Sequence, residues 1–540
     1  MSKIIKAVNE PIKSYGSGSP ERESLQAKYD EMASQNIDIP IIIGGKEIYT
    51  GNTGNCVMPH NHQNVLATYQ KAGKTEANLA INTAMKAWEV WSKTSLEERT
   101  TIFRKAAKLL QGPWRDTINA ATMLNQSKNA FQAEIDAACE LIDFFNFNAQ
   151  YAEQIYTNQP LISPEGIQNS LEYRPLEGFV FAITPFNFTS IAGNLPSAPA
   201  LVGNVALWKP ASSAVYPCHF IMQLLKEAGL PDGVINFLPG SGGEVGDPVL
   251  KNKNLAGVHF TGSTETFQHI WKTIGTNINQ YNTYPRIVGE TGGKDFCLAH
   301  ESANIEELVT AMIRGAFEYQ GQKCSAMSRA YIPKTIWKEL KEKYLSELET
   351  ITVGSPRDFT NFMNAVIDKS AFDSITKYID YAKNADETEL ISGGRYDDSV
   401  GYYIQPTTIL TSDPLFKTME EEIFGPVLTI YLYDPADWDN TIDLVDSTSP
   451  YGLTGCIIGK DKEAMSHAKD RLTHSAGNFY INDKPTGAVV GQQPFGGSRS
   501  SGTNDKAGSE LNLQRWISIR TVKETFDTPK NYRYPFLEKD

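Results

Sequence analysis

Cysteine pairs and long apolar runs are both lacking in this chain. Its six cysteines stand singly, and no two show the spacing of a zinc knuckle or a disulfide scaffold. No apolar run approaches the ~20 residues of a membrane-spanning helix, so we expect no membrane partner. The first residues lack the apolar core of a signal peptide and include Glu10, Glu21 and Glu23, which a mitochondrial presequence would avoid. We therefore expect a cytoplasmic protein.

Positive charge is also in deficit. The 540 residues contain 50 Lys and Arg against 63 Asp and Glu, a net charge of −13, which argues against nucleic acid as a partner. Hydrophobic residues at 41% and charged residues at 21% are ordinary for a folded protein and exclude wholesale disorder. His60 and His62 are too isolated for a metal site, so we predict no metal and a solvated loop there.

The arrangement of helical and strand-like patterns predicts an α/β fold. Residues 1–70 are polar and turn-rich, and helical periodicity follows to about 158, with a capping box formed by Ser95 and Glu98. From 178 onward, short β-rich runs alternate with helical segments, which is typical of a parallel sheet. Such sheets bind ligands at the carboxyl ends of their strands. The predicted strands are 179–184, 205–209, 234–238 and 258–261.

The usual nucleotide-binding fingerprints are missing. The stretch 240–245 fails Gly-x-Gly-x-x-Gly at its last position, and Val288 stands where a P-loop needs its first glycine. What remains is Phe-Thr-Gly-Ser-Thr-Glu at 260–265, which follows a strand and opens a helix. Free amides at a helix N-terminus suit a pyrophosphate. Taken alone, the motif is more often an ordinary strand–turn–helix cap.

Three residues suggest acyl chemistry, although each has an ordinary structural alternative. Cys324 lies among polar turn residues beside Lys323, a setting that we expect to lower its pKa and give a nucleophilic thiolate. Asn187 follows a strand, where its amide can stabilise an oxyanion, and Glu290 in a glycine-rich stretch is a candidate general base. The alternatives are an inert packed cysteine and two turn residues.

Together and in this order, the motifs resemble the aldehyde dehydrogenase superfamily. The resemblance covers nearly the whole chain, and Cys324 lies 34 positions after Glu290, as in that family. The motifs are Pro185-Phe186-Asn187-Phe188, Trp208-Lys209-Pro210, Phe260-Thr261-Gly262-Ser263, Glu290-Thr291-Gly292-Gly293-Lys294, Gly321-Gln322-Lys323-Cys324 and Glu422-Ile423-Phe424-Gly425-Pro426.

Further motifs resemble one branch of that superfamily, the 1-pyrroline-5-carboxylate dehydrogenases. They include Asn9-Glu10-Pro11, Glu140-Leu141-Ile142-Asp143-Phe144-Phe145, Gln492-Gln493-Pro494-Phe495-Gly496-Gly497 and Ser501-Gly502-Thr503-Asn504-Asp505-Lys506. This resemblance implies NAD-dependent oxidation of glutamate semialdehyde to glutamate, a step of proline catabolism. The alternatives are a dehydrogenase for another aldehyde and a non-catalytic nucleotide-binding protein of the same fold.

The resemblance implies a division of the chain into two bodies and an arm. A Rossmann-like NAD-binding domain would comprise 1–158 and 179–289, and a second α/β catalytic domain would comprise 290–484. Residues 159–178 and 510–540 would form a small β oligomerisation arm and tail, and 485–509 a substrate-anchoring loop region. A homodimer or a larger homo-oligomer is expected, with Tyr532, Tyr534 and Phe536 of the tail packing on a neighbouring subunit.

Catalytic roles follow from the same resemblance. Cys324 would attack the aldehyde, the Asn187 amide and the Cys324 N–H would hold the oxyanion, and Glu290 would activate water to release the acid. The residues implied in cofactor binding are Thr184, Lys209, Gly262, Ser263, Thr264, Glu265, Thr266 and Glu422. Ser212 stands where many NAD-specific members have Glu, so some NADP use is expected beside NAD.

Substrate contacts are implied as well. Ser325 with the amides of Gly487 and Ala488 would bind the α-carboxylate, and such buried donors would discriminate against aldehydes that lack it. Phe188 and Phe495 would flank the aliphatic part, and Glu140 would face the ammonium group. One departure from the superfamily pattern is Phe267, which stands where many members have glycine.

Overall fold

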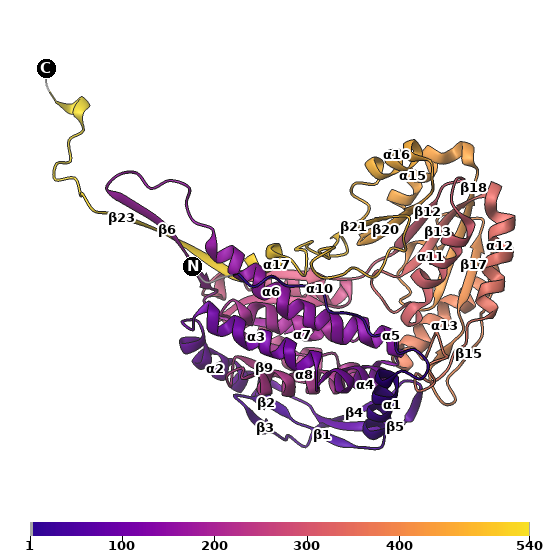
Figure 1. Ribbon diagram of the computed structural model, residues 1–540, viewed down its shortest axis with the longest axis horizontal. Helices are drawn as coiled ribbons and strands as arrows, with labels where there is room; N and C mark the ends of the chain where they lie inside the picture. Colours follow the sequence, from indigo (N-terminus) through magenta and orange to yellow (C-terminus); the bar gives the residue numbers. More distant parts are fainter. Residues whose placement is uncertain (1–3, 539–540) are drawn as a thin grey trace.

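A computed structural model describes residues 4–538 as two α/β bodies with a projecting two-stranded ribbon (Figure 1). The first body contains a seven-stranded sheet of order β11-β10-β7-β8-β9-β2-β3. Each of the four predicted strands is present in it, and all four run parallel. The strands are β11 (Arg286–Glu290), β10 (Leu255–Thr261), β7 (Phe179–Ile183), β8 (Val205–Lys209), β9 (Ile235–Phe237), β2 (Ile41–Ile43) and β3 (Lys46–Ile48).

Helices from the early and from the later part of the first body's sequence cover this sheet. The predicted capping box opens α3, where the Ser95 hydroxyl accepts from the Glu98 N–H at 3.2 Å and the Glu98 carboxylate accepts from the Ser95 N–H at 3.1 Å. Trp91 fastens α2 to α7 by donating from its indole to the Ala200 carbonyl at 2.9 Å. The helices are α2 (Lys74–Trp91), α3 (Leu96–Gln111), α4 (Arg115–Gln126), α7 (Thr189–Leu201), α8 (Val215–Ala228), α9 (Gly242–Leu250) and α10 (Thr264–Thr276).

The second body contains another seven-stranded sheet, of order β14-β17-β18-β13-β12-β20-β21. Six of its strands are parallel to their neighbours, and β14 is antiparallel at the edge. The strands are β14 (Thr388–Ser392), β17 (Thr407–Thr411), β18 (Val427–Tyr433), β13 (Met327–Pro333), β12 (Asp295–Ala299), β20 (Thr454–Ile458) and β21 (Asn478–Ile481). The helices are α11 (Ile305–Phe317), α12 (Lys334–Glu349), α13 (Lys369–Lys383), α14 (Lys417–Glu420), α15 (Trp438–Ser447) and α16 (Lys462–Arg471).

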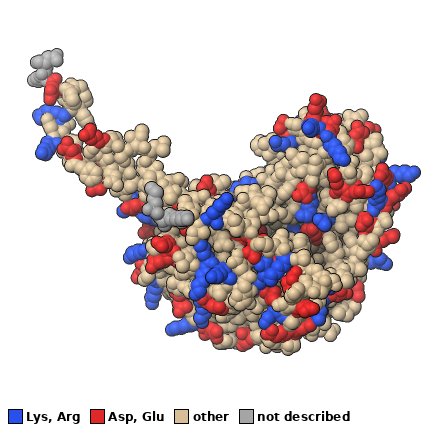
Figure 2. Space-filling model, in the orientation of Figure 1, with Lys and Arg blue, Asp and Glu red and all other residues tan. Residues whose placement is uncertain are grey.

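Two distant segments form the projecting ribbon. β6 (Ile167–Pro175) pairs antiparallel with β23 (Ile517–Thr525) along its whole length, and α17 (Glu510–Gln514) precedes β23. The ribbon leaves the first body and carries the C-terminal tail outward (Figure 1). Figure 2 shows that most of its visible surface is uncharged, whereas basic and acidic side chains are interspersed over the two bodies.

The first 70 residues are more structured than the sequence predicted. They contain α1 (Pro20–Ala33), capped by Ser19, and a three-stranded sheet of β1 (Ile37–Ile39), β5 (Asn61–Gln70) and β4 (Thr53–Met58). The prediction of a solvated loop at His60 is wrong. Its ring is 4% exposed, with Nε2 2.9 Å from the Tyr29 hydroxyl and Nδ1 3.2 Å from the Ser127 hydroxyl.

The predicted helix near 129–145 contains an irregularity. α5 (Ala130–Ala133) runs into a π-helical segment, η1 (Glu134–Cys139), and then into α6 (Glu140–Thr157). Insertions of this kind often mark functional sites. Within residues 4–538, no helix is both long and apolar enough to cross a membrane.

Candidate active site

The candidate catalytic residues come from both bodies and converge between them. From the first body, Asn187 follows β7 and Glu290 ends β11, at the carboxyl edge of the sheet where ligands bind in parallel α/β folds. From the second body, the turn before β13 brings Cys324 to the same place. Cys324 is close enough to Glu290 for that carboxylate to influence its pKa.

An unusual backbone turn presents Cys324. Tyr319 and Gln320 both have positive φ, 51° and 56°, and a Cβ on Gly321 would lie 2.2 Å from the Gly425 carbonyl oxygen. Gln320 secures the turn by donating from its amide to the Ser127 carbonyl at 3.1 Å and to the Ala365 carbonyl at 2.8 Å. Left-handed backbone at non-glycine residues is strained and clusters at functional sites. The turn therefore holds the thiol in one fixed position.

Asn187 is attached directly to this turn. Its Nδ2 donates to the Gln322 carbonyl oxygen at 3.0 Å, two residues before Cys324, and its side chain is 4% exposed. An amide nitrogen carries two hydrogens, so one N–H takes no part in this bond and is available to another acceptor. This is the arrangement that stabilisation of an oxyanion beside Cys324 requires.

The backbone of Glu290 is held by two neighbouring segments. Its carbonyl accepts from the Gly262 N–H at 3.1 Å, and it forms a bridge with Gly502. Burial raises the pKa of its carboxyl to about 8, a rise that Lys506 opposes and Asp505 reinforces. A carboxyl with a pKa near neutrality is suited to act as a general base.

The expected activation of Cys324 by Lys323 is wrong. The Lys323 ammonium lies 3.6 Å from the Asp136 carboxylate and 3.5 Å from that of Glu318, so its charge is engaged away from the sulfur. Burial, followed by the carboxylate of Glu290, raises the pKa of the Cys324 thiol well above its usual value. Burial and the charge of Glu290 therefore favour the neutral thiol of Cys324 over the thiolate.

Four of the residues predicted to bind the cofactor, Ser263, Thr264, Glu265 and Glu422, line a groove between the two bodies. The first body contributes 263–265 and the second contributes 420–422 and 447–451, and the Thr264 and Tyr451 hydroxyls lie 3.3 Å apart. Ser263 caps α10, accepting from the Thr266 N–H at 3.3 Å, which places free amides at the mouth of the groove. Glu265 and Thr266 are exposed there.

Glu422 in this groove and two buried residues outside its lining, Lys209 and Thr184, are further candidates for contact with a dinucleotide. Lys209 ends β8, is 9% exposed and has its ammonium 3.3 Å from the Pro210 carbonyl, and burial lowers its pKa to about 8. A buried ammonium with so little compensation suits ribose hydroxyls. Glu422 accepts from the Gly293 N–H at 2.9 Å, and burial raises its pKa to about 7. Thr184 accepts from the Trp208 indole at 3.0 Å.

The bulky Phe267 next to the Gly262 turn is accommodated by its surroundings. Its ring stacks on Phe260 with centroids 5.5 Å apart, and a Cβ on Gly289 would lie 2.2 Å from it. The absence of a side chain at 289 thus provides the space that Phe267 fills.

The residues predicted to bind the substrate come from several segments of the chain. The Ser325 hydroxyl lies 2.7 Å from that of Thr486, which directly precedes Gly487 and Ala488. Gly487 is exposed with φ +93°, and Ala488 is half-buried. Phe188 and Phe495 are also half-buried. Glu140, the first residue of α6, accepts a short hydrogen bond from Ser190 on α7, and burial raises its pKa to about 8.

The sequence did not reveal a buried ionic group beneath Phe188. The Lys128 ammonium lies 2.7 Å from Asp136 and 4.4 Å from the ring centroids of Phe188 and Tyr319. Because Asp136 also faces Lys323, one carboxylate serves two buried ammonium groups. These residues are far apart in sequence and follow no periodicity, so only the tertiary structure shows the group.

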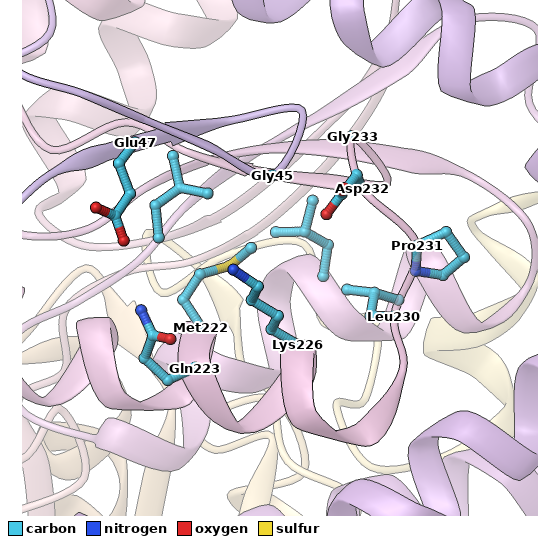
Figure 3. A pocket seen from close by; sticks show the side chains of 11 residues that line it. Gly45, Glu47, Met222, Gln223, Lys226, Leu230, Pro231, Asp232 and Gly233 are labelled. Atoms are coloured by element: carbon cyan, nitrogen blue, oxygen red, sulfur yellow. The ribbon is translucent and has the colours of Figure 1, made fainter.

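A separate small hollow lies away from these residues (Figure 3). Gly45, Met222, Lys226 and Leu230 line it, near the turn that leads into β9. It therefore opens at the amino ends of the parallel strands, opposite the edge that carries Asn187 and Glu290, and shares no residue with the candidate active site.

The family follows from a comparison with known proteins. The model of the family described as "Aldehyde dehydrogenase family" matches residues 49–522. The chain belongs to the aldehyde dehydrogenase family. The predicted fold class and family resemblance are confirmed, whereas the roles of individual residues and the domain limits stay predictions.

Members of this family with named activities are similar over their full length. Delta-1-pyrroline-5-carboxylate dehydrogenase, mitochondrial, of Dictyostelium discoideum is 51% identical, covering 98% of this chain and 95% of the relative. The Homo sapiens protein of the same name is 45% identical, covering 99% and 95%. The crystal structure of the Mycobacterium tuberculosis Delta-pyrroline-5-carboxylate dehydrogenase bound with NAD is 49% identical, with a TM-score of 0.97 and coverage of 100% and 99%.

Proposed function

We propose that this aldehyde dehydrogenase oxidises glutamate semialdehyde, the open form of 1-pyrroline-5-carboxylate, to glutamate with NAD. The observation that carries the proposal is the contact between Ser325 and Thr486, at 2.7 Å. It joins the residue after the nucleophile to the loop that presents the Gly487 and Ala488 amides. The names of the full-length relatives support the same substrate.

The mechanism uses groups of this chain together with NAD and water. Cys324 Sγ bonds to the aldehyde carbon as Glu290 takes the thiol proton, and the carbonyl oxygen becomes an oxyanion held by the Asn187 amide and the Cys324 N–H. NAD, when bound, supplies the acceptor for the hydride that leaves this carbon. Glu290 releases the thiol proton to solvent and then takes a proton from water as the water oxygen attacks the thioester carbon. The C–S bond breaks, which releases the acid and leaves Cys324 as a thiolate that regains a proton.

Recognition of the amino-acid end explains why a semialdehyde is preferred. The Ser325 hydroxyl and the amides of Gly487 and Ala488 bind the α-carboxylate, and Glu140 faces the ammonium group. Phe188 and Phe495 flank the aliphatic part. An aldehyde without the carboxylate leaves these donors unpaired, which costs affinity.

A substrate comparison tests this proposal. We expect the wild type to form NADH with pyrroline-carboxylate at a far higher kcat/KM than with propanal, and to prefer NAD over NADP. Ser325→Ala should raise the KM for pyrroline-carboxylate roughly tenfold, the effect of about one hydrogen bond, and leave propanal unaffected. A higher kcat/KM for propanal in the wild type would contradict the substrate and favour a dehydrogenase for another aldehyde.

A second comparison tests the nucleophile. Cys324→Ala should retain its melting temperature and NAD binding but form no NADH, because no other group can make the thioester. Cys218→Ala, which changes a buried cysteine on α8, is the matched control and should turn over normally. Normal turnover by Cys324→Ala would contradict the mechanism, and NAD binding without NADH formation by the wild type would favour a non-catalytic protein.

The assembly and the cellular location belong to the proposal as well. The exposed β6–β23 ribbon supports a homo-oligomer. The acidic residues Glu10, Glu21 and Glu23 favour the cytoplasm, although the Dictyostelium discoideum and Homo sapiens relatives are named mitochondrial. Cell fractionation tests the location, and recovery with mitochondria would contradict it.

A further inference from the structure

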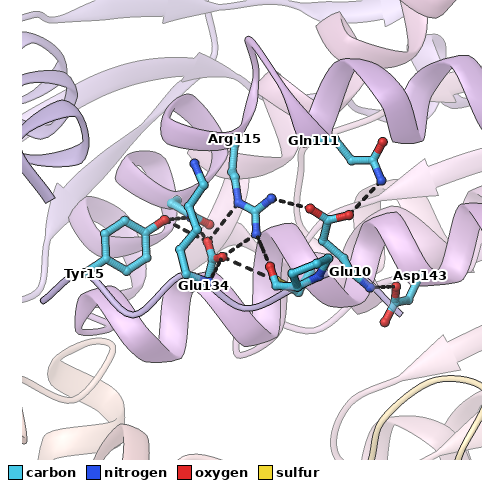
Figure 4. Close-up of polar contacts among 10 residues, drawn as sticks. Glu10, Tyr15, Gln111, Arg115, Glu134 and Asp143 are labelled. Carbon is cyan, nitrogen blue, oxygen red and sulfur yellow. Dashed lines mark hydrogen bonds and ion pairs between the residues drawn. The ribbon is translucent and has the colours of Figure 1, made fainter. Parts of the chain in front are cut away.

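An extended segment near the N-terminus, residues 7–15, lies across α4 and α6 and is here called the N-terminal strap. Glu10 fastens it, with its N–H donating to Asp143 at 2.8 Å and its carboxylate pairing with Arg115 at 2.5 Å and accepting from Gln111 at 2.7 Å (Figure 4). Tyr15 donates to Glu134 at 2.8 Å. The strap therefore has a defined path over the helices rather than a loose one.

Asn9 of the strap touches the substrate-anchoring loop region. Its Nδ2 donates to the Val490 carbonyl at 2.7 Å and to Asp143 at 2.8 Å, and its Oδ1 accepts from the Gln492 amide at 3.0 Å. Both hydrogens and the oxygen of the amide are thus used. An aspartate cannot donate these bonds, and a serine has only one hydrogen to donate. The site therefore requires the full asparagine amide.

The two elements joined by Asn9 both belong to the proposed substrate site. Val490 lies two residues after Ala488, in the loop that presents the amides for the α-carboxylate. Asp143 lies three residues after Glu140 on α6, so the two share one helix face. Asn9 thus connects the group that binds the carboxylate to the group that faces the ammonium.

The other features of the loop around Val490 allow the Asn9 hydrogen bonds to fix its position. Val490 is buried, but Gly491 has φ +81°, and the side chains of Gln492 and Gln493 are exposed. A Cβ on Gly491 would lie 2.3 Å from the Phe147 ring, so the loop backbone passes directly over α6. The Phe147 ring gives the loop an apolar contact with α6. Polar contacts, such as those of Asn9, then fix the position of the loop along α6 and with it the direction of the 487–488 amide N–H groups.

We propose that Asn9 is a positioning residue for substrate specificity, setting the distance between the loop at 487–490 and helix α6. It touches neither the sulfur nor the groove for the cofactor, and it acts through the loop. The inference rests on the proposed function, because it concerns recognition of an aldehyde that carries an amino-acid group. It predicts that loss of Asn9 weakens binding of that group and leaves the chemical step intact.

The experiment compares two aldehydes in three variants. Asn9→Ala should raise the KM for pyrroline-carboxylate about tenfold, change kcat by less than about twofold, and leave kcat/KM for propanal unchanged. Gln492→Ala, at an exposed position, should give the same pattern to a smaller extent, about threefold. Val8→Ala, next to Asn9 with its side chain 71% exposed, is the matched control and should behave as the wild type.

The outcomes separate this inference from the proposed function. If the wild type prefers pyrroline-carboxylate and Asn9→Ala keeps the wild-type KM, the positioning role is overturned and the proposed function stands. Equal losses with both aldehydes in Asn9→Ala and Gln492→Ala also overturn it, because they would indicate a general effect on folding. A wild type without preference for pyrroline-carboxylate overturns the proposed function itself.

Discussion

Glu290 and Cys324 have pKa values shifted in the same direction for the same reason. Both are buried, and each carries a negative charge in its reactive form, so burial raises both pKa values. A raised thiol pKa makes the thiolate rare but strongly nucleophilic once formed. A carboxyl with a pKa of about 8 can accept the thiol proton and later the proton of water. The pair therefore suits proton transfer during reaction better than a standing thiolate would.

A pH profile tests the state of Glu290. Its carboxylate form, which accepts protons, predominates above about pH 8 and is lost as the pH falls through that value. We therefore expect kcat to rise between pH 6.5 and 9. Glu290→Gln should reduce kcat by roughly 10²–10⁴-fold and abolish this rise.

The control for this profile is Glu301→Gln, at an exposed position after β12, which should keep the wild-type rise. Steady-state NADH formation, measured with substrate and NAD in excess, is the readout. A wild-type kcat that is flat from pH 6.5 to 9, or a Glu290→Gln variant with the wild-type profile, would contradict the assignment of the base.

At the scale of single residues, the direction of a side chain is what the sequence could not predict. The position of Cys324 in a polar turn could be predicted, because turn residues flank it in sequence. The direction of Lys323 could not, because its partners Asp136 and Glu318 come from η1 and from the preceding turn. Residues that are adjacent in sequence have adjacent backbones, but their side chains can point apart. A lysine side chain is long enough to place its charge far from the neighbouring residue.

At the scale of helices and strands, the sequence predicted those features that depend on residues close together in the chain. The capping box at Ser95 and the four predicted strands of the first sheet follow from residues close in sequence, and the structure confirms them. The π-helical segment at Glu134–Cys139 was not predicted, because its partners are remote. Glu134 accepts from Tyr15 and Asn119 and pairs with Arg115, and these contacts support the wider helical turn.

The stability of this segment can be tested at Arg115. Its side chain is 3% exposed and pairs with Glu134, which is fully buried, and with Glu10. Arg115→Ala leaves a buried carboxylate without its cation, which should cost about 3–5 kcal/mol in free energy of unfolding. Urea denaturation followed by circular dichroism measures this cost.

The comparison for Arg115→Ala is an exposed ion pair. Lys251→Ala removes the partner of Asp247 at 3.5 Å, where both side chains are more than half exposed, and should cost less than about 1 kcal/mol. Equal effects of the two substitutions would show that the Glu134 network contributes little to stability.

At the scale of the whole molecule, the length of the projecting ribbon raises the question of what stabilises it. β6 and β23 pair along nine residues each, yet a two-stranded ribbon is only marginally stable alone in water. Exposed apolar side chains accompany it, with Leu161 fully exposed, Ile162 73% exposed and Ile519 52% exposed. Such a surface is typical of a protein–protein interface, and here we expect a second copy of the chain to cover it.

We therefore expect the mass of the protein in solution to depend on Ile519 of the ribbon. Ile519→Lys places a charge on the apolar face and should shift the protein from an oligomer toward a monomer, as measured by light scattering after gel filtration. Val400→Lys, at an equally exposed apolar position on the second body, should leave the mass unchanged. A wild type that already runs as a monomer, or an Ile519→Lys variant with unchanged mass, would contradict assembly through the ribbon, because a buried lysine at its centre could not be tolerated without a partner charge.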